Sequence, residues 1–191
     1  YATNADALRV WAALGADFAW LSPELTLAQI KKLADESPIP VGLVVHGRQE
    51  LMVSDHCFLM AEGPCDQKCA KCARRKGQQR FYKDRKGYMF PVVTDVNGRG
   101  HLYNAVKLDI VHAIGDLKRA GVTGFAVDTT LLSEDEGEQQ FYRARRALQG
   151  KDVEKEENTT AGNLFRNRTG AKKTVREKEA EARAARRAER R

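Results

Sequence analysis

The sequence contains no apolar run long enough to cross a lipid bilayer. The run PVGLVV at residues 40–45 is among its longest, whereas a membrane-spanning helix needs about 20 apolar residues. The opening YATNADALRVWAALG also lacks the basic segment and small-residue cleavage site of a secretory signal. We therefore predict a cytoplasmic protein without membrane contact.

Cysteine is scarce, and the four cysteines of the chain fall within 16 residues. They are Cys57, Cys65, Cys69 and Cys72, with the spacing C-x7-C-x3-C-x2-C. Without a secretory signal, such crowding favours a metal site over a disulfide framework. Four thiolates suit either an iron–sulfur cluster or tetrahedral zinc. The spacing leaves both metals open, because it matches neither the paired knuckles of a zinc ribbon nor a common ferredoxin pattern.

The formal net charge of +7 is unevenly distributed. Residues 151–191 hold 13 Lys and Arg against 8 acids, and their helix formers show no apolar stripe. We expect a charged tail there, either a solvated helix or disordered chain. Nine Lys and Arg also lie between Lys68 and Lys86, with Phe81 and Tyr82 among them. This mixture suits RNA or another anionic substrate, although many charge runs are only solvated surface.

Helices and strands alternate in residues 1–150, which predicts an α/β fold with a parallel sheet. Helix starts are predicted at Asn4, at Thr26 with Gln29, at Asp109, and at Ser133 with Glu136. Strands are predicted at residues 17–21, 41–45 and 124–127. The order is compatible with an open doubly wound sheet or with part of a barrel.

An insertion at about residues 46–108 interrupts this alternation and carries the cysteines. Within it, residues 90–93 and 101–106 flank a glycine-rich turn and predict a strand pair. In parallel α/β folds, ligands bind beyond the carboxyl ends of the strands. We therefore expect the residues that follow each strand to form one pocket with the metal on its rim. These residues are Ser22, Glu24, His46, Gly47, Arg48, Glu50, Asp128, Thr129 and Thr130.

Several longer stretches carry a family resemblance. They are LSPELTLAQIKKLADESPIPVGLVVHGRQELMVSDHCFL, KDRKGYMFPVVTD and HLYNAVKLDI, followed by TTAGNLFRNR at residues 159–168. In this order they resemble the collagenase-like peptidase family of unassigned catalytic type, number thirty-two in that class. The resemblance implies that the chain supplies the C-terminal half of a (β/α)8 TIM-like barrel. It also implies that the partner is either a missing N-terminal half or a second copy of the chain, because half a barrel leaves strand edges unpaired.

The resemblance further implies a cofactor. Although the family was named for proteolysis, several branches hold an oxygen-labile 4Fe-4S cluster and hydroxylate RNA bases or the ring of ubiquinone precursors. Cys57, Cys65 and Cys69 match the family's cysteine positions. Many relatives carry a further Cys just before HLYN, where this chain has residues 97–100, NGRG. The fourth ligand is then Cys72 or a residue upstream of this sequence.

Three functions follow from these observations. The first is an iron–sulfur enzyme that hydroxylates or otherwise modifies RNA or a small aromatic substrate. For this enzyme, the predicted catalytic residues are Glu50, Asp128 and His56, and the predicted substrate-binding residues are Arg48, Arg85, Lys83, Tyr82, His101 and Asn104. The second is an endopeptidase, although no H-E-x-x-H motif is present and the adjacent His56 and Cys57 do not establish a catalytic pair. The third is an RNA-binding module with structural zinc.

Overall fold

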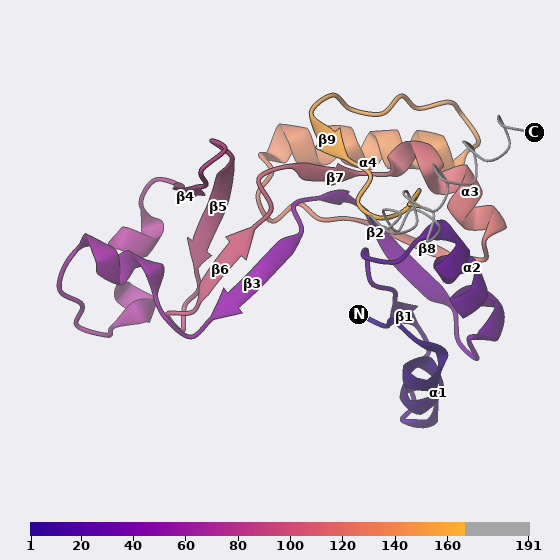
Figure 1. The fold of residues 1–191 in the computed structure, drawn as a ribbon, viewed down its shortest axis with the longest axis horizontal. Coiled ribbons are helices and arrows are strands. Elements are labelled where there is room, and N and C mark those ends of the chain that lie inside the picture. Colours follow the sequence, from indigo (N-terminus) through magenta and orange to yellow (C-terminus); the bar gives the residue numbers. More distant parts are fainter. Residues whose placement is uncertain (167–191) are drawn as a thin grey trace, which may run out of the picture.

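Two sheets of different type organise residues 1–166, which are the residues that the computed structural model describes (Figure 1). The first is a five-stranded sheet made of β1 (Ala19–Trp20), β2 (Val41–Gly47), β7 (Lys107–Asp109), β8 (Gly124–Val127) and β9 (Thr159–Thr160). The second is a four-stranded antiparallel sheet in the order β3 (Glu50–Ser54), β6 (Gly100–Tyr103), β5 (Met89–Thr94) and β4 (Arg80–Lys83). We call the first sheet with its helices the body, and residues 50–103 the arm.

The central strand of the body is β2. It pairs in parallel with β1 (Ala19↔Val41) and with β8 (Leu43↔Phe125), and its end pairs antiparallel with β7 (His46↔Asp109). Six of its seven residues are buried, which confirms the strand predicted from the apolar run at 41–45 and its burial on both faces. The strand predicted at residues 124–127 is likewise confirmed as β8.

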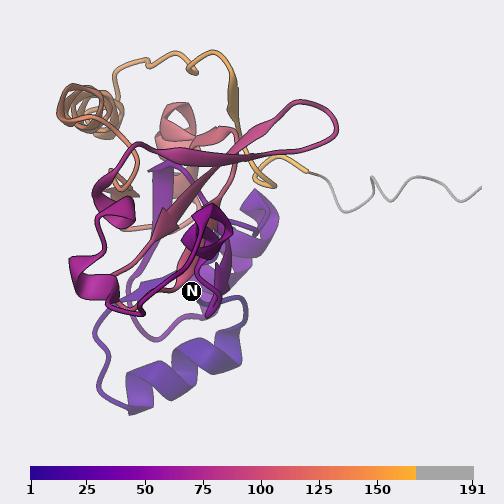
Figure 2. The same ribbon diagram turned by 90° about the vertical axis from the view of Figure 1, so that its left-hand side faces the viewer.

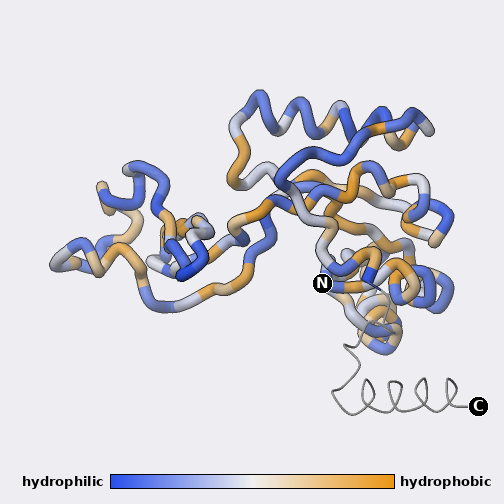
Figure 3. Tube along the Cα trace, turned by 45° about the horizontal axis from the view of Figure 1, so that its top comes forward, coloured by the Kyte–Doolittle hydropathy of each residue, from blue (hydrophilic) through white to orange (hydrophobic). Residues whose placement is uncertain are grey.

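Four helices accompany the body: α1 (Ala5–Ala13), α2 (Leu27–Glu36), α3 (Ile114–Arg119) and α4 (Glu134–Leu148). The predicted cap at Asn4 and the capping boxes at Thr26 and Ser133 are confirmed, since each side chain accepts a hydrogen bond from the first turn of its helix. In two perpendicular views, α1 and α4 lie at opposite ends of the body (Figures 1 and 2). Most residues of α4 are hydrophilic (Figure 3), and only one narrow stripe of the helix is buried.

The prediction that Asp109 caps a helix is wrong. Asp109 is the last residue of β7 and is fully buried, and α3 begins only at Ile114, after a 3₁₀ turn over Val111–Ala113. The carboxylate of Asp109 accepts hydrogen bonds from the backbone N–H of Val111 (3.2 Å) and Glu156 (2.7 Å) and from Arg143 Nη2 (3.0 Å). Pairing with the end of β2 has drawn this residue into the sheet.

The charged tail predicted at 151–191 is also partly wrong. Residues 151–166, here called the return segment, run back over the body and contribute β9, which pairs in parallel with β7. Leu164 is buried, and its carbonyl accepts a hydrogen bond from Leu27 N (2.9 Å). Backbone pairing and ion pairs hold this segment where the sequence shows no apolar stripe. The rest of the predicted tail lies outside the described residues.

The architecture is mixed α/β, as predicted. The described strands form two open sheets and no closed barrel, so the predicted half of a (β/α)8 barrel is not confirmed. The hairpin predicted in the insertion is confirmed, since β5 and β6 pair antiparallel (Val92↔Leu102). The second strand of this hairpin was predicted to reach residue 106 but ends at Tyr103. The next strand, at residues 107–109, belongs to the sheet of the body. Within residues 1–166, no helix has the length and apolar character that crossing a membrane requires.

The buried Asp109–Arg143 ion pair should contribute strongly to stability. Replacing Arg143 with Ala leaves a buried carboxylate without its cation, which costs about 3–5 kcal/mol. We expect this loss in the free energy of unfolding measured by urea denaturation. Arg145→Ala, on an exposed position of the same helix, is the control and should cost under about 1 kcal/mol. Equal losses in the two variants would contradict this role of Asp109.

The fully buried His46 predicts a pH dependence of stability. Burial lowers the pKa of His46 even though its Nε2 lies 3.1 Å from Glu156 Oε2, so the ring is neutral at pH 7 and donates from Nε2. The unfolded chain, with an ordinary His pKa of about 6.5, binds an extra proton as the pH falls. Between pH 7.5 and 5.5, the stability of His46→Gln should therefore fall less than that of the parent, by at most about 1.4 kcal/mol, the difference for a folded His46 that stays neutral throughout. Parallel pH curves would show that His46 titrates normally.

Candidate functional site

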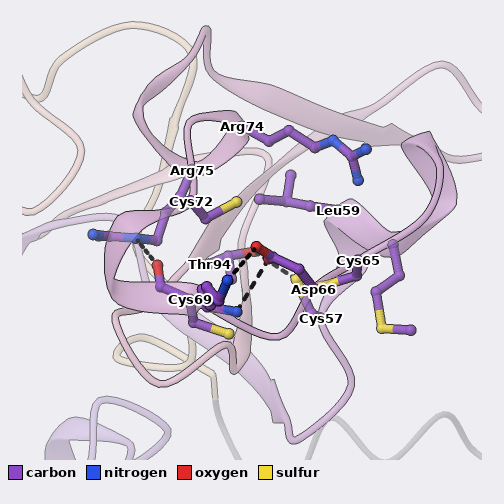
Figure 4. A pocket seen from close by; sticks show the side chains of 11 residues that line it. Cys57, Leu59, Cys65, Asp66, Cys69, Cys72, Arg74, Arg75 and Thr94 are labelled. Atoms are coloured by element: carbon purple, nitrogen blue, oxygen red, sulfur yellow. Dashed lines mark hydrogen bonds and ion pairs between the residues drawn. The ribbon is translucent and has the colours of Figure 1, made fainter.

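The four cysteines line one cavity in the arm. Leu59, Met60, Thr94, Arg74 and Arg75 share its wall, and Figure 4 shows how the side chains surround it. Short 3₁₀ turns at Phe58–Glu62, Cys69–Lys71 and Arg74–Lys76 carry or flank the cysteines. These turns lie at the end of the arm farthest from the body (Figure 1). Residues that are 15 positions apart in the sequence thus meet at one cavity.

The chemistry of this cavity suits a soft metal. All four thiols are free; Cys57, Cys69 and Cys72 are half-buried, and Cys65 is exposed. Cys57 Sγ donates weakly to Thr94 Oγ1 (3.9 Å), and Cys65 Sγ accepts from Gln67 N (3.3 Å). Among residues 1–166, no three His, Cys, Asp or Glu side chains are already assembled in a metal-binding arrangement. Four thiols at one cavity are a donor set that fits zinc or an iron–sulfur cluster. Because the thiols are not yet assembled, ligation requires the turns to draw closer.

A glycine turn borders the cysteine cavity. Gly98 is buried and has a φ of 85°, and a Cβ added there would lie 2.6 Å from Cys69 Sγ. Gly98 lies in the turn where the family resemblance places a further Cys. In this chain, position 98 of the turn is a glycine without a side chain, and Cys69 Sγ lies where a side chain at position 98 would be.

A second cavity lies where the strands of the body end. Its volume is about 370 Å³, within the range of small-molecule sites. We call it the strand-end cleft. Its polar lining includes Ser22, Glu24, Arg48, Gln49, Glu50, Tyr103 and Asp128. The expectation that residues following three separate strands lie together is thus met for Ser22, Glu24, Arg48, Glu50 and Asp128.

One acid of the strand-end cleft, Glu50, contacts a histidine outside the lining, which in turn lies near Asp95. Glu50 Oε1 lies 2.5 Å from His101 Nδ1, and Asp95 Oδ2 lies 3.6 Å from His101 Nε2. Burial, together with the charges of Glu50 and Asp128, raises the pKa of the Tyr103 hydroxyl. Glu50 and His101 are thus within hydrogen-bond distance of each other, which is the distance that proton transfer requires.

Arg48 is the one Lys or Arg among the described lining residues of the cleft. Its Nη1 donates to the carbonyls of Asn104 (2.9 Å) and Ala105 (2.6 Å), and no carboxylate of the described chain lies within ion-pair distance. Burial lowers the pKa of Arg48, but a guanidinium keeps its charge in proteins. The cleft thus has one cation whose remaining donors are available to a ligand.

The two cavities are separate, so the expectation that the cysteines lie on the rim of the cleft is wrong. Glu50 at the start of β3 lines the cleft, whereas Cys57 follows the end of β3 at Ser54. At 3.4 Å per residue, the strand alone spans about 14 Å. Two further cavities share lining residues with these two and with each other. One shares Thr94 with the cysteine cavity, the other shares Arg48 with the cleft, and both include Gln79.

The other predicted site residues lie outside both linings. His56 is exposed, and Lys83 and Arg85 are exposed in the hairpin between β4 and β5. Tyr82 packs edge-on against Phe58, with 5.4 Å between ring centroids. His101 and Asn104 act on the cleft through Glu50 and Arg48. Sequence reasoning missed Thr94, Tyr103 and Gly98, and the glycine-rich turn beside HLYN was the available signal for the last of these.

Comparison with known proteins gives one match. A family model described as Peptidase family U32 matches residues 1–182. No curated protein and no solved structure matches the chain.

The contact of Gly98 with Cys69 predicts that a side chain at position 98 impairs metal binding. In Gly98→Ala, the new methyl group displaces Cys69 Sγ, and we expect at least a twofold loss of bound metal per protein after anaerobic reconstitution. Gly87→Ala is a matched control, because Gly87 also has a positive φ (88°) but its Cβ would meet only Lys83 Cε, at 3.9 Å. Both changes impose similar backbone strain. Equal metal content in the two variants would show that the space beside Cys69 is unimportant.

Proposed function

The chain belongs to peptidase family U32, and from this membership we propose that it is an iron–sulfur enzyme that hydroxylates or otherwise modifies RNA or a small aromatic substrate. The observation that carries the proposal is the meeting of all four cysteines at one cavity. The four thiols match the donor set of a 4Fe-4S cluster. When bound, the cluster supplies electron transfer that side chains alone do not provide.

Cys57, Cys65, Cys69 and Cys72 are the proposed ligands. The first three match the family pattern, and Cys72 replaces the further family cysteine because it lines the same cavity. The turn at residues 97–100 offers no thiol, and Gly98 faces Cys69. This choice completes a ligand set from the described residues.

The substrate binds in the strand-end cleft in this proposal. Arg48 binds an oxyanion of the substrate through its free donors. Glu50 accepts or returns a proton at its carboxylate, and His101, 2.5 Å away, exchanges protons with it. Asp128, which directly follows β8, provides a second carboxylate in the cleft, and Tyr103 provides a hydroxyl.

The endopeptidase function takes its support from the family description alone. A thiol peptidase needs a histidine that activates a cysteine. In residues 1–166, no histidine is hydrogen-bonded to a cysteine sulfur; the sulfur partners are Thr94 Oγ1 and Gln67 N. A structural zinc site that supports RNA binding uses the same four thiols, so metal analysis separates it from the iron–sulfur enzyme.

Anaerobic purification and reconstitution test the proposal. We expect brown protein with iron and sulfide and with absorption near about 400 nm, and we expect Cys57→Ser, Cys69→Ser and Cys72→Ser each to lose most of the iron. Met60→Leu, which changes a cavity-lining residue that is not a proposed ligand, should keep it. Colourless protein with one zinc would refute the iron–sulfur assignment. Peptide cleavage that survives loss of the metal in Cys57→Ser and Cys69→Ser would favour the peptidase.

A further inference from the structure

Three arginines bind the backbone of the turns that surround the cysteine cavity. Arg74 donates from Nη1 to Gly63 O and from Nη2 to Pro64 O, both at 3.1 Å, immediately before Cys65. Arg75 donates from Nε to Cys69 O (3.3 Å) and from Nη2 to Ala70 O (3.4 Å). Each guanidinium thus spans two neighbouring carbonyls of a cysteine-bearing segment. We call Arg74, Arg75 and Arg80 the arginine brace.

Arg80 connects the brace to the second sheet. It belongs to β4, and it forms an ion pair with Glu62 at the end of the turn that follows Cys57. Its Nη1 also donates to Arg74 O (2.8 Å). Through these contacts, the brace joins the segments carrying Cys57, Cys65 and Cys69 to one strand.

The turns need this support because they have almost no apolar core. The 3₁₀ turns Cys69–Lys71 and Arg74–Lys76 bury no residue, and Phe58–Glu62 buries only Leu59. Short 3₁₀ turns also have poorer hydrogen-bond geometry than α-helices. A planar guanidinium that binds two carbonyls fixes their relative position with little loss of entropy per bond. The brace therefore takes the place of apolar packing around the cysteines.

Two arginines of the brace also contribute to the charge around the cavity. Arg74, Arg75 and Lys68 line it, against the single acid Asp66 among its described lining residues. Metal ligation by four thiolates concentrates negative charge at this place, and nearby cations stabilise it.

From these contacts, we propose that Arg74 and Arg75 are positioning residues of a metal centre: they hold the cysteine turns in place for ligation and compensate the charge of the thiolates. The inference rests on the proposed metal centre, but it applies to zinc and to an iron–sulfur cluster alike. It also assigns two residues of the basic run at 68–86 a structural role inside the arm. Each of these arginines uses two donors on the protein's own carbonyls, so fewer of its donors remain for RNA.

The test separates the charge of Arg75 from its two-carbonyl contact. Arg75→Lys keeps the charge and loses the fork, and Arg75→Gln loses both. Arg99→Gln is the control, because exposed Arg99 in the same arm has only a 4.0 Å contact with Asp55. The affinity for zinc is measured on the anaerobic, reduced protein by competition with a chelator, and thermal unfolding of the metal-free protein reports on folding.

We expect both Arg75 variants to bind zinc about 10-fold to 100-fold more weakly than the parent, as is usual when support for metal ligands is lost. Arg99→Gln should stay within about twofold of the parent. If the reconstituted parent contains iron and sulfide, Arg75→Gln should lower its reduction potential more than Arg75→Lys does. A merely structural role would leave the Lys and Gln variants with the same potential.

Unchanged zinc affinity in Arg75→Gln would overturn the proposal, as would a parent that binds no metal. If Arg75→Gln does not fold, Arg74→Gln is measured in its place, since Arg74 supports the adjacent segment before Cys65. A parent that binds zinc but takes up no iron refutes the iron–sulfur enzyme and leaves the brace to be judged on zinc affinity alone. The failures of the two proposals are therefore distinguishable.

Discussion

A fully buried carboxylate at Asp109 determines how the body is assembled. Burial alone would raise the pKa of Asp109, but hydrogen bonds from Glu156 N, Arg143 and Val111 N outweigh that effect and keep its pKa below the usual value. Each donor comes from a different part of the chain: α4, the return segment and the turn after β7. Because a buried charge is tolerated only when it is paired and hydrogen-bonded, these three parts of the chain must come together around the Asp109 carboxylate. β2 joins them through the pairing of His46 with Asp109.

This network also positions the strand-end cleft. Glu156 contacts His46, which immediately precedes the cleft residues Gly47 and Arg48. Farther along the return segment, Asn163 Nδ2 donates to Glu24 O (3.1 Å), so the loop after β1 is held as well. The return segment therefore fixes two sides of the cleft without lining it. The arm begins directly beyond the same end of β2, at Glu50, and carries the cysteines away from the body.

The predictable parts of the structure are those with local causes. Capping boxes at Thr26 and Ser133 and the buried strand at 41–45 depend on residues close in sequence, and they appear as predicted. The hairpin predicted at 90–106 also forms, but its second strand ends at Tyr103. The crowding of four cysteines likewise indicated one shared cavity. The return segment was not predictable, because Glu156 meets His46 across 110 positions and the segment has no hydrophobic pattern. The basic run at 68–86 was predicted to bind RNA or another anionic substrate, with solvated surface as the alternative, because a sequence does not show that an Arg side chain will bind carbonyls of its own chain.

The separation of the two cavities restricts the chemistry that the cysteines perform. Glu24, Glu50, Asp128 and Arg48 line the cleft, and the thiols lie beyond the far end of β3, about 14 Å away by the rise of an antiparallel strand. A cysteine that attacked a peptide bond would need its base within hydrogen-bond reach, and His101 is bound to Glu50 instead. Metal ligation makes no such demand, because it needs only sulfur donors that converge and a surrounding that supports them. The arm brings the four thiols to one cavity and supports their turns with arginines, and the proposed ligation requires only that these turns draw closer. This arrangement fits the proposed metal site better than it fits nucleophilic attack.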